Sequence, residues 1–271
     1  KDGKIINARK DFGVYQFHEQ DAQQYASWGI DYLKYDWANE HVPFTVAMHD
    51  ALQKTDRDII LSISGSVDIG DVKSISQYSN LWRVNPDIND SWKSIYSRGF
   101  YHDRWSPYQS VGHWNDPDML TVGVVGWGKS LHDTKLTPNE QYTHISLWAL
   151  FSAPMILGCD LSQLDDFTLG LLKNNEVISI NQDPKGRPAE HIVADYQNGK
   201  HVFVKKLYDG TYAIGLFNTS AEDQTIKFNI KDFHFTGKML RDVWRQKDIG
   251  KAKEGIEAKV KPHGVVLLKV Y

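Results

Sequence analysis

The chain has 271 residues, 41% hydrophobic and 24% charged, which is an ordinary globular composition with room for one large domain or a large and a small one. Its 34 acidic and 31 basic side chains give a net charge of −3, which provides no basic field for a nucleic-acid backbone. No apolar run approaches the roughly 18 residues of a membrane span. The single cysteine, Cys159, excludes an internal disulfide and a cysteine-based zinc site.

Aromatic side chains are the informative part of the composition. There are 9 Trp, 13 Tyr and 11 Phe, and many of them stand beside polar residues. Flat rings next to hydrogen-bonding groups suit the faces of sugars, and a well-filled core accounts for them equally well.

The first two thirds of the chain alternate between helix-like and strand-like segments. In chain order the pattern predicts helix 21–28, strand 30–35, helix 44–52, strand 58–64, helix 72–78, strand 81–84, helix 92–100, strand 111–114, helix 138–151, strand 154–157 and helix 161–172. Five strand–helix units with apolar strands predict a parallel sheet covered by helices. They could form an open doubly wound sheet or the last part of an eight-unit barrel.

The pattern changes near residue 187. Alternating segments follow from His191 onward, and Asp209-Gly210 between two of them is a strong hairpin signal. The last 80 or so residues therefore predict an antiparallel β-sandwich. Pro184, Gly186 and Pro188 mark the boundary, which gives predicted domains of 1–186 and 187–271.

Acidic residues follow the predicted strands, where an α/β protein gathers its functional groups. The first strand runs into Asp36, and Lys34 points to the same side because strand side chains alternate. A nearby ammonium would keep this carboxylate ionised and nucleophilic. The alternative is that Asp36 caps the next helix.

A second acid, Asp87, follows the third strand, and Arg83 lies close enough to bias it or to hold a substrate oxygen. The alternative is a helix N-cap, for which Asn89 and Asp90 compete with Asp87.

The fourth strand leads into the rigid acidic turn Asp116-Pro117-Asp118. Such a turn is compatible with a cation site, a clamp for sugar hydroxyls or a plain turn.

The 11 histidines are scattered, so we expect no metal and no cofactor. Two carboxylates facing one pocket are what glycoside hydrolysis needs. The sequence has neither a glycine-rich phosphate loop nor the nucleophile elbow of serine hydrolases.

These strand-end residues resemble the clan D glycoside hydrolases of family 27, the melibiase-type α-galactosidases and α-N-acetylgalactosaminidases. The blocks that carry the resemblance are Tyr32–Asp36 (YLKYD), Trp82-Arg83 with Asp87, His113–Met119 (HWNDPDM), Ser146–Met155 (SLWALFSAPM), Gly158–Asp160 (GCD) and Glu176–Pro184 (EVISINQDP), with weaker matches at Asp242–Trp244 and His263–Leu267.

The resemblance implies a (β/α)8 barrel followed by an antiparallel β-sandwich. The YLKYD block normally closes the fourth barrel strand, so the five predicted units correspond to about strands four to eight. We therefore expect the full protein to be longer, with its first strands and any export signal supplied by a segment before Lys1. Export to a secreted or periplasmic location is expected by resemblance only, and oligomerisation is possible.

The resemblance also assigns roles. Asp36 would be the nucleophile and Asp87 the acid/base of a retaining mechanism with a covalent glycosyl-enzyme intermediate. Lys34, Ser64, Arg83, Asp118 and Met119 would bind the sugar, and Asp116 would brace the turn.

The sequence departs from the family pattern at two places, of which the first bears on specificity and the second on stability. Ser64 stands where the α-galactosidases place a Glu that reads the sugar 2-hydroxyl, and Ala38-Asn39 replaces a cysteine of a family disulfide. We expect an exo-acting α-galactosidase on a glycoside substrate. The same chemistry on α-N-acetylgalactosaminides or β-L-arabinopyranosides is the first alternative, and a sugar-binding protein without catalysis is the second.

Overall fold

The computed structural model describes residues 15–36, 42–229, 233, 235–253 and 255–271. The expectations about Lys1 and about Ala38-Asn39 lie outside the described residues. The chain divides into two compact units. One contains the residues up to Asp87 together with Gly112–Asp118, and the other contains Ile88–Val111 together with Met119–Tyr271.

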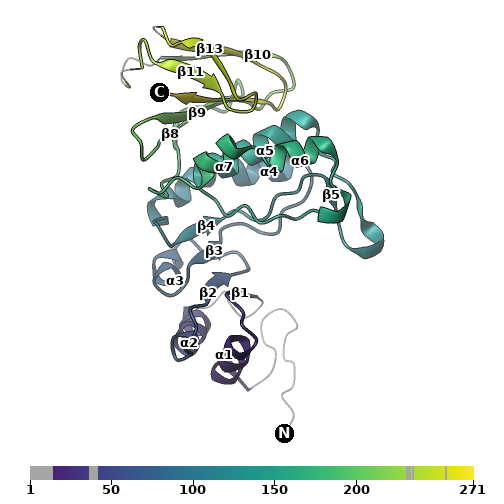
Figure 1. Cartoon of the computed structure of the whole chain (residues 1–271), viewed down its shortest axis with the longest axis vertical. Coiled ribbons are helices and arrows are strands. Elements are labelled where there is room, and N and C mark those ends of the chain that lie inside the picture. Colours follow the sequence, from purple (N-terminus) through teal and green to yellow (C-terminus); the bar gives the residue numbers. More distant parts are fainter. Residues whose placement is uncertain (1–14, 37–41, 230–232, 234, 254) are drawn as a thin grey trace. The chain divides into compact units, whose positions relative to one another are not determined.

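A four-stranded parallel sheet in the order β1-β2-β3-β4 forms the first unit (Figure 1). Its elements are α1 (His18–Ser27), β1 (Tyr32–Tyr35), α2 (Val42–Gln53), β2 (Ile60–Ile63), α3 (Val72–Tyr78), β3 (Leu81–Arg83) and β4 (Trp114–Asp116). The register aligns Tyr35, Ile63, Trp82 and Asn115 across the four strands. All four strands therefore end at one edge of the sheet.

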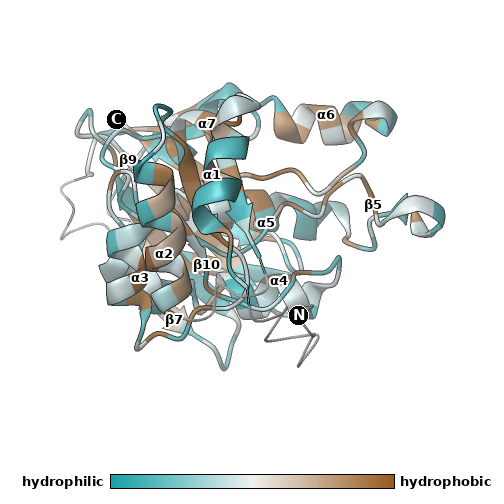
Figure 2. Ribbon diagram, turned by 90° about the horizontal axis from the view of Figure 1, so that it is seen from below, coloured by the Kyte–Doolittle hydropathy of each residue, from teal (hydrophilic) through white to brown (hydrophobic). Residues whose placement is uncertain are grey.

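The two faces of this sheet differ in chemistry. Ile63 and Trp82 lie on one face, fully buried, and the Trp82 indole N–H donates to Asn115 Oδ1 at 2.9 Å. Lys34 and Asp36 alternate onto the other face, which Lys34 shares with Ser62 and Leu81, and both are exposed. Helix α1 buries little itself, and Figure 2 shows it as mostly hydrophilic.

The second unit begins with helices and a short hairpin. These elements are α4 (Trp92–Gly99), η1 (His102–Tyr108), β5 (Val124–Val125), η2 (Gly128–Ser130), β6 (His132–Asp133), α5 (Pro138–Phe151), η3 (Leu161–Gln163), α6 (Asp166–Leu172) and α7 (Asn175–Asn181). Helix α5 begins with Thr137, which forms a capping box with Glu140, and it ends at Ser152 in the left-handed conformation. Almost all of α5 is buried, so it is the central helix of this unit.

A β-sandwich completes the second unit. One sheet has the order β12-β11-β14-β9-β8-β7, and β10 pairs with β13. The strands are β7 (Glu190–Asp195), β8 (Lys200–Lys206), β9 (Tyr212–Asn218), β10 (Gln224–Asn229), β11 (Met239–Asp242), β12 (Lys247–Lys251), β13 (Gly255–Val260) and β14 (Val265–Val270). All the strand pairs are antiparallel, as predicted. The Asp209-Gly210 hairpin is confirmed, with Gly210 at φ +83°.

Helix α5 and the six-stranded sheet share one hydrophobic core, in which Trp148 and Phe151 lie with Phe203 and Phe217. The predicted boundary near residue 186 stays a prediction.

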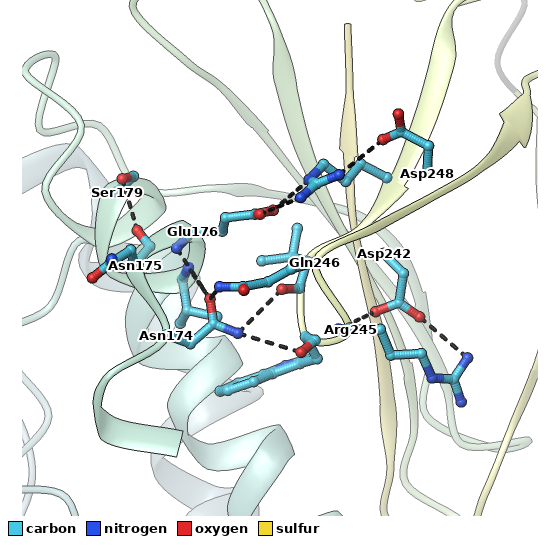
Figure 3. A network of polar contacts seen from close by, with 12 residues as sticks. Asn174, Asn175, Glu176, Ser179, Asp242, Arg245, Gln246 and Asp248 are labelled. Atoms are coloured by element: carbon cyan, nitrogen blue, oxygen red, sulfur yellow. Dashed lines mark hydrogen bonds and ion pairs between the residues drawn. The ribbon is translucent and has the colours of Figure 1, made fainter. Parts of the chain in front are cut away.

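Polar contacts join helix α7 to the six-stranded sheet (Figure 3). Arg241 of β11 donates from Nε and an Nη to the two carboxylate oxygens of Glu176, at 2.8 and 2.6 Å.

Some predicted elements were wrong in detail. The fourth strand is Trp114–Asp116 rather than 111–114. The predicted strand 154–157 is irregular apart from a single parallel bridge between Leu157 and Leu120. The predicted helix 161–172 is interrupted, because Asp165 accepts from the Thr168 N–H and so caps a separate helix, α6.

Lys205 is a buried cation within this shared core. Its Nζ donates to Ser152 Oγ at 2.6 Å, to the Ile180 carbonyl at 2.5 Å and to the Ala149 carbonyl at 3.2 Å, which ties the ends of α5 and α7 to β8. Burial lowers the pKa of Lys205 to about 7, against the opposing attraction of Asp183.

A pH-dependent stability follows from this lowered pKa. The folded state binds fewer protons than the unfolded state from about pH 7 to about pH 10, so Lys205 makes stability rise with pH there, by at most about 1.4 kcal/mol per pH unit. Denaturant unfolding of the wild type and of Lys205→Met at pH 7 and pH 9 tests this. We expect the rise to be smaller in the variant, and the same pH dependence in both proteins would contradict it.

Candidate active site

The carboxyl edge of the parallel sheet gathers the predicted polar residues of the first unit. Asp36 follows β1 directly, Ser64 follows β2, Arg83 ends β3 and Asp116 ends β4. The Ser64 N–H donates to the Tyr35 carbonyl at 2.9 Å, which continues the pairing of β1 and β2 to this edge. These four residues therefore stand at one level of the sheet, as predicted for a barrel-type site.

Arg83 forms ion pairs with two acidic residues at this edge of the sheet. Its side chain is only 4% exposed, and one of its terminal nitrogens lies 2.7 Å from Asp118 Oδ2 and 3.2 Å from Asp87 Oδ1. The same nitrogen donates to the Asn85 carbonyl at 3.0 Å. The prediction that Arg83 lies within reach of Asp87 is confirmed. One buried guanidinium thus holds two carboxylates that are 31 residues apart in sequence.

The two carboxylates on Arg83 differ in exposure. The Asp118 side chain is 2% exposed, whereas that of Asp87 is 96% exposed. The helix-cap explanation of Asp87 is wrong, and so are its rivals Asn89 and Asp90, because Ser91 Oγ accepts from the Ser94 N–H and caps α4. Asp87 therefore presents its carboxyl to solvent from a position fixed by Arg83.

The turn after β4 is braced in the predicted way. Asp116 Oδ1 accepts from the Asp118 N–H at 2.8 Å. Asp118 has φ of +91°, which is strained for a residue other than glycine and is retained where the surroundings demand it. The ion pair of its carboxylate with Arg83 helps to hold Asp118 in this conformation.

Lys34 acts on the same turn. Burial raises the pKa of Asp116, and Lys34, the Asp118 N–H and Arg83 oppose that rise. The ammonium on β1 therefore contributes to the electrostatics of β4, a long-range effect that the sequence alone did not indicate.

The remaining predicted residues take different positions. Ser64 is buried, and the Gly65 that follows it has φ of +87°, a left-handed conformation that favours glycine. Met119 belongs to the second unit, where it packs against the core of α5 and lines a pocket.

Within the part of the chain that the structure describes, no three His, Cys, Asp or Glu side chains form a group able to hold a metal ion. Over the same residues, no helix has the length and apolar character needed to cross a membrane.

A parallel α/β sheet with carboxylates at its carboxyl edge, followed by an antiparallel sandwich, is the arrangement expected of the barrel-type glycosidases. Comparison with known proteins gives the family. Residues 8–183 match the family profile described as alpha galactosidase A, and residues 197–270 match the alpha galactosidase C-terminal beta sandwich domain. The chain belongs to the α-galactosidase (melibiase) family of glycoside hydrolases.

Individual relatives agree with this assignment. The α-galactosidase of Oryza sativa subsp. japonica is 33% identical over 258 residues, which cover 93% of this chain and 59% of the relative. Among crystal structures, α-galactosidase I of Mortierella vinacea is 26% identical with a TM-score of 0.86, over 96% of this chain and 72% of that one. A family 27 β-L-arabinopyranosidase of Geobacillus stearothermophilus is 26% identical with a TM-score of 0.87, over 98% and 66%. The chain thus spans about three fifths of the length of the rice relative.

Proposed function

We propose that the protein removes terminal α-galactosyl groups with retention of configuration, Asp36 being the nucleophile and Asp87 the acid/base. The Asp36 carboxylate attacks the anomeric carbon while the bond to the leaving oxygen breaks and Asp87 gives that oxygen its proton. Asp87 then takes a proton from water, the water oxygen replaces Asp36 on the sugar, and the free carboxylate returns.

The observation that carries this proposal is the buried Arg83 with its two unequal carboxylates. Asp118 pairs with Arg83 at the shorter distance and is buried, whereas Asp87 keeps its carboxyl exposed, where it can reach the leaving oxygen of a glycoside. Lys34 lies two residues before Asp36 on the same face of β1, where its ammonium can bind the sugar. Ser64, Asp118 and Met119 are proposed sugar-binding residues.

The substituent that the site accepts at C2 of the sugar depends on Ser64. A small hydroxyl side chain at the end of β2 leaves room there and carries no charge. It therefore also suits α-N-acetylgalactosaminides. β-L-arabinopyranosides, which lack the 6-hydroxymethyl group of galactosides, are a separate alternative supported by the likeness to the Geobacillus enzyme. Hydrolysis rates on the three nitrophenyl glycosides rank these substrates, and a faster rate on either alternative would replace galactose in the proposal.

The acid/base role is tested by changing the leaving group. In Asp87→Asn we expect kcat/KM to fall about 10²- to 10⁴-fold on an alkyl galactoside, which needs protonation, and far less on a dinitrophenyl galactoside, which does not. The two substrates share one sugar, so each is the control for the other. An equal loss on both would show that Asp87 positions the sugar and does not transfer the proton.

We also propose that a segment outside this chain supplies the rest of the barrel, and that the protein is secreted or periplasmic. The share of its relatives that the chain covers supports the first statement, and the family resemblance supports the second. Sequencing the gene upstream of Lys1 and fractionating cells that express it test both.

A further inference from the structure

A hollow of about 420 Å³ lies between helix α4 and two turns of the β-sandwich. One turn, residues 196–199, joins β7 to β8, and the other begins after β9 with Thr219 and Ser220. All the lining residues that the structure describes belong to the second unit, so the hollow forms within that unit alone. Its volume lies in the range of small-ligand sites.

Backbone contacts hold the two turns together. The Thr219 N–H donates to the Gly199 carbonyl at 2.8 Å. Gly199 has φ of +69°, and a Cβ there would lie 2.9 Å from the Ser220 nitrogen, so this close approach requires glycine. Asp195 accepts from the N–H and the side-chain amide of Asn198, at 3.1 and 2.8 Å. The turns are thus fixed before any ligand arrives, which reduces the entropy lost on binding.

Aromatic rings make up the apolar part of the lining. Trp92 and Tyr96 of α4 line the hollow together with Tyr196, which is 41% exposed. Tyr101 stacks on Tyr196, with the ring centroids 5.2 Å apart and the ring planes 6° apart. The Tyr196 hydroxyl donates to the Phe100 carbonyl at 3.0 Å. These two contacts position the Tyr196 ring and leave part of it accessible to a ligand.

The polar part of the lining carries little charge. Amide and hydroxyl groups come from Gln197, Asn198, Thr219 and Ser220. Lys93 is the one charged side chain among the lining residues that the structure describes, so the hollow has no pattern of charges to pair with a nucleotide or an acidic peptide. Aromatic rings bordered by neutral hydrogen-bonding groups fit a neutral saccharide, which has C–H faces edged by hydroxyls.

We propose that this hollow binds a neutral polysaccharide and that Tyr196 is its main contact. The choice of a polysaccharide with α-galactosyl branches rests on the proposed function, whereas the chemistry of the lining does not depend on it. A polymer bound at this point would keep its branches at a high effective concentration near the protein. The second unit would thus retain the polymer from which the terminal groups are removed.

Affinity gel electrophoresis in galactomannan, a neutral polymer with α-galactosyl branches, tests this assignment. For Tyr196→Ala we expect the dissociation constant for galactomannan to rise about threefold to tenfold, the size of one lost aromatic contact. Tyr196→Phe keeps the ring and should bind almost as the wild type does. Tyr208→Ala changes a 63% exposed tyrosine in another turn of the same unit and is the matched control, with unchanged binding. Hydrolysis of a nitrophenyl α-galactoside should be the same in all three variants and the wild type.

The other outcomes are distinguishable. Equal dissociation constants for the wild type and Tyr196→Ala, or no retardation of the wild type, would overturn the proposal. Equal losses of binding and of nitrophenyl galactoside hydrolysis would show that the ring supports the fold. A lower molar mass of Tyr196→Ala in light scattering would assign the rings to contact with a second copy of the chain. If galactomannan retards the wild type through Tyr196 but no galactoside is cleaved, the polysaccharide site stands and the proposed function fails.

Discussion

Replacing Asp36 with asparagine is expected to lower turnover of a nitrophenyl α-galactoside by about 10⁴-fold or more, because the neutral amide cannot form the glycosyl ester on which the mechanism depends. Steady-state hydrolysis under saturating substrate measures this directly. Thermal unfolding of the variant should stay close to that of the wild type, since Asp36 is exposed at the end of β1.

Asp31→Asn provides the matched control. Asp31 precedes the same strand, and its side chain is 75% exposed in an ion pair with Arg57. We expect this variant to keep wild-type turnover. If Asp36→Asn and Asp31→Asn turn over equally fast, Asp36 is not the nucleophile. If even the wild type binds galactose without cleaving its glycosides, the protein belongs to the non-catalytic sugar-binding alternative.

The second large effect is expected for Arg83→Met. Removing the guanidinium leaves Asp118 buried without its partner at 2.7 Å, and breaking a buried ion pair in this way costs about 3–5 kcal/mol of folding free energy. Denaturant unfolding measures the loss, and turnover should fall as well because Asp87 loses the group that positions it.

Two comparisons make this prediction specific. Arg57→Met breaks the exposed pair with Asp31 and should cost no more than about 1 kcal/mol. Adding Asp118→Asn to Arg83→Met removes the buried charge that has lost Arg83 and should recover part of the stability, since asparagine tolerates a positive φ. Equal losses for Arg83→Met and Arg57→Met would contradict the central position given to Arg83.

The sequence predicted best those elements whose ends are set locally. Helix α5 matches the prediction at both of its ends, with Pro138 in its first turn beside the Thr137 cap. The Asp209-Gly210 turn also specifies its hairpin by itself. The run Pro154–Leu157 was misassigned because a short apolar segment looks like a strand whether or not it has a partner to pair with.

At the site, the sequence placed the acids at the strand ends but not their contacts. The spacing of Arg83 and Asp87 indicated their contact, but Asp118 reaches Arg83 only after β3 and β4 have paired, so no local spacing predicts that second contact. The choice between a capping and a catalytic reading of Asp87 likewise needed the structure, which shows Ser91 as the cap. The positive φ of Asp118 could not be predicted from the sequence either, because tertiary contacts impose this conformation on the aspartate.

The most direct test of the central claim is to trap the intermediate with a 2-deoxy-2-fluoro galactosyl fluoride and to map the labelled peptide by mass spectrometry. The proposed retaining mechanism predicts a single covalent label on Asp36, with the α-anomer as the first product when the unmodified substrate is followed by NMR. A label on another residue, or first release of the β-anomer, would contradict it.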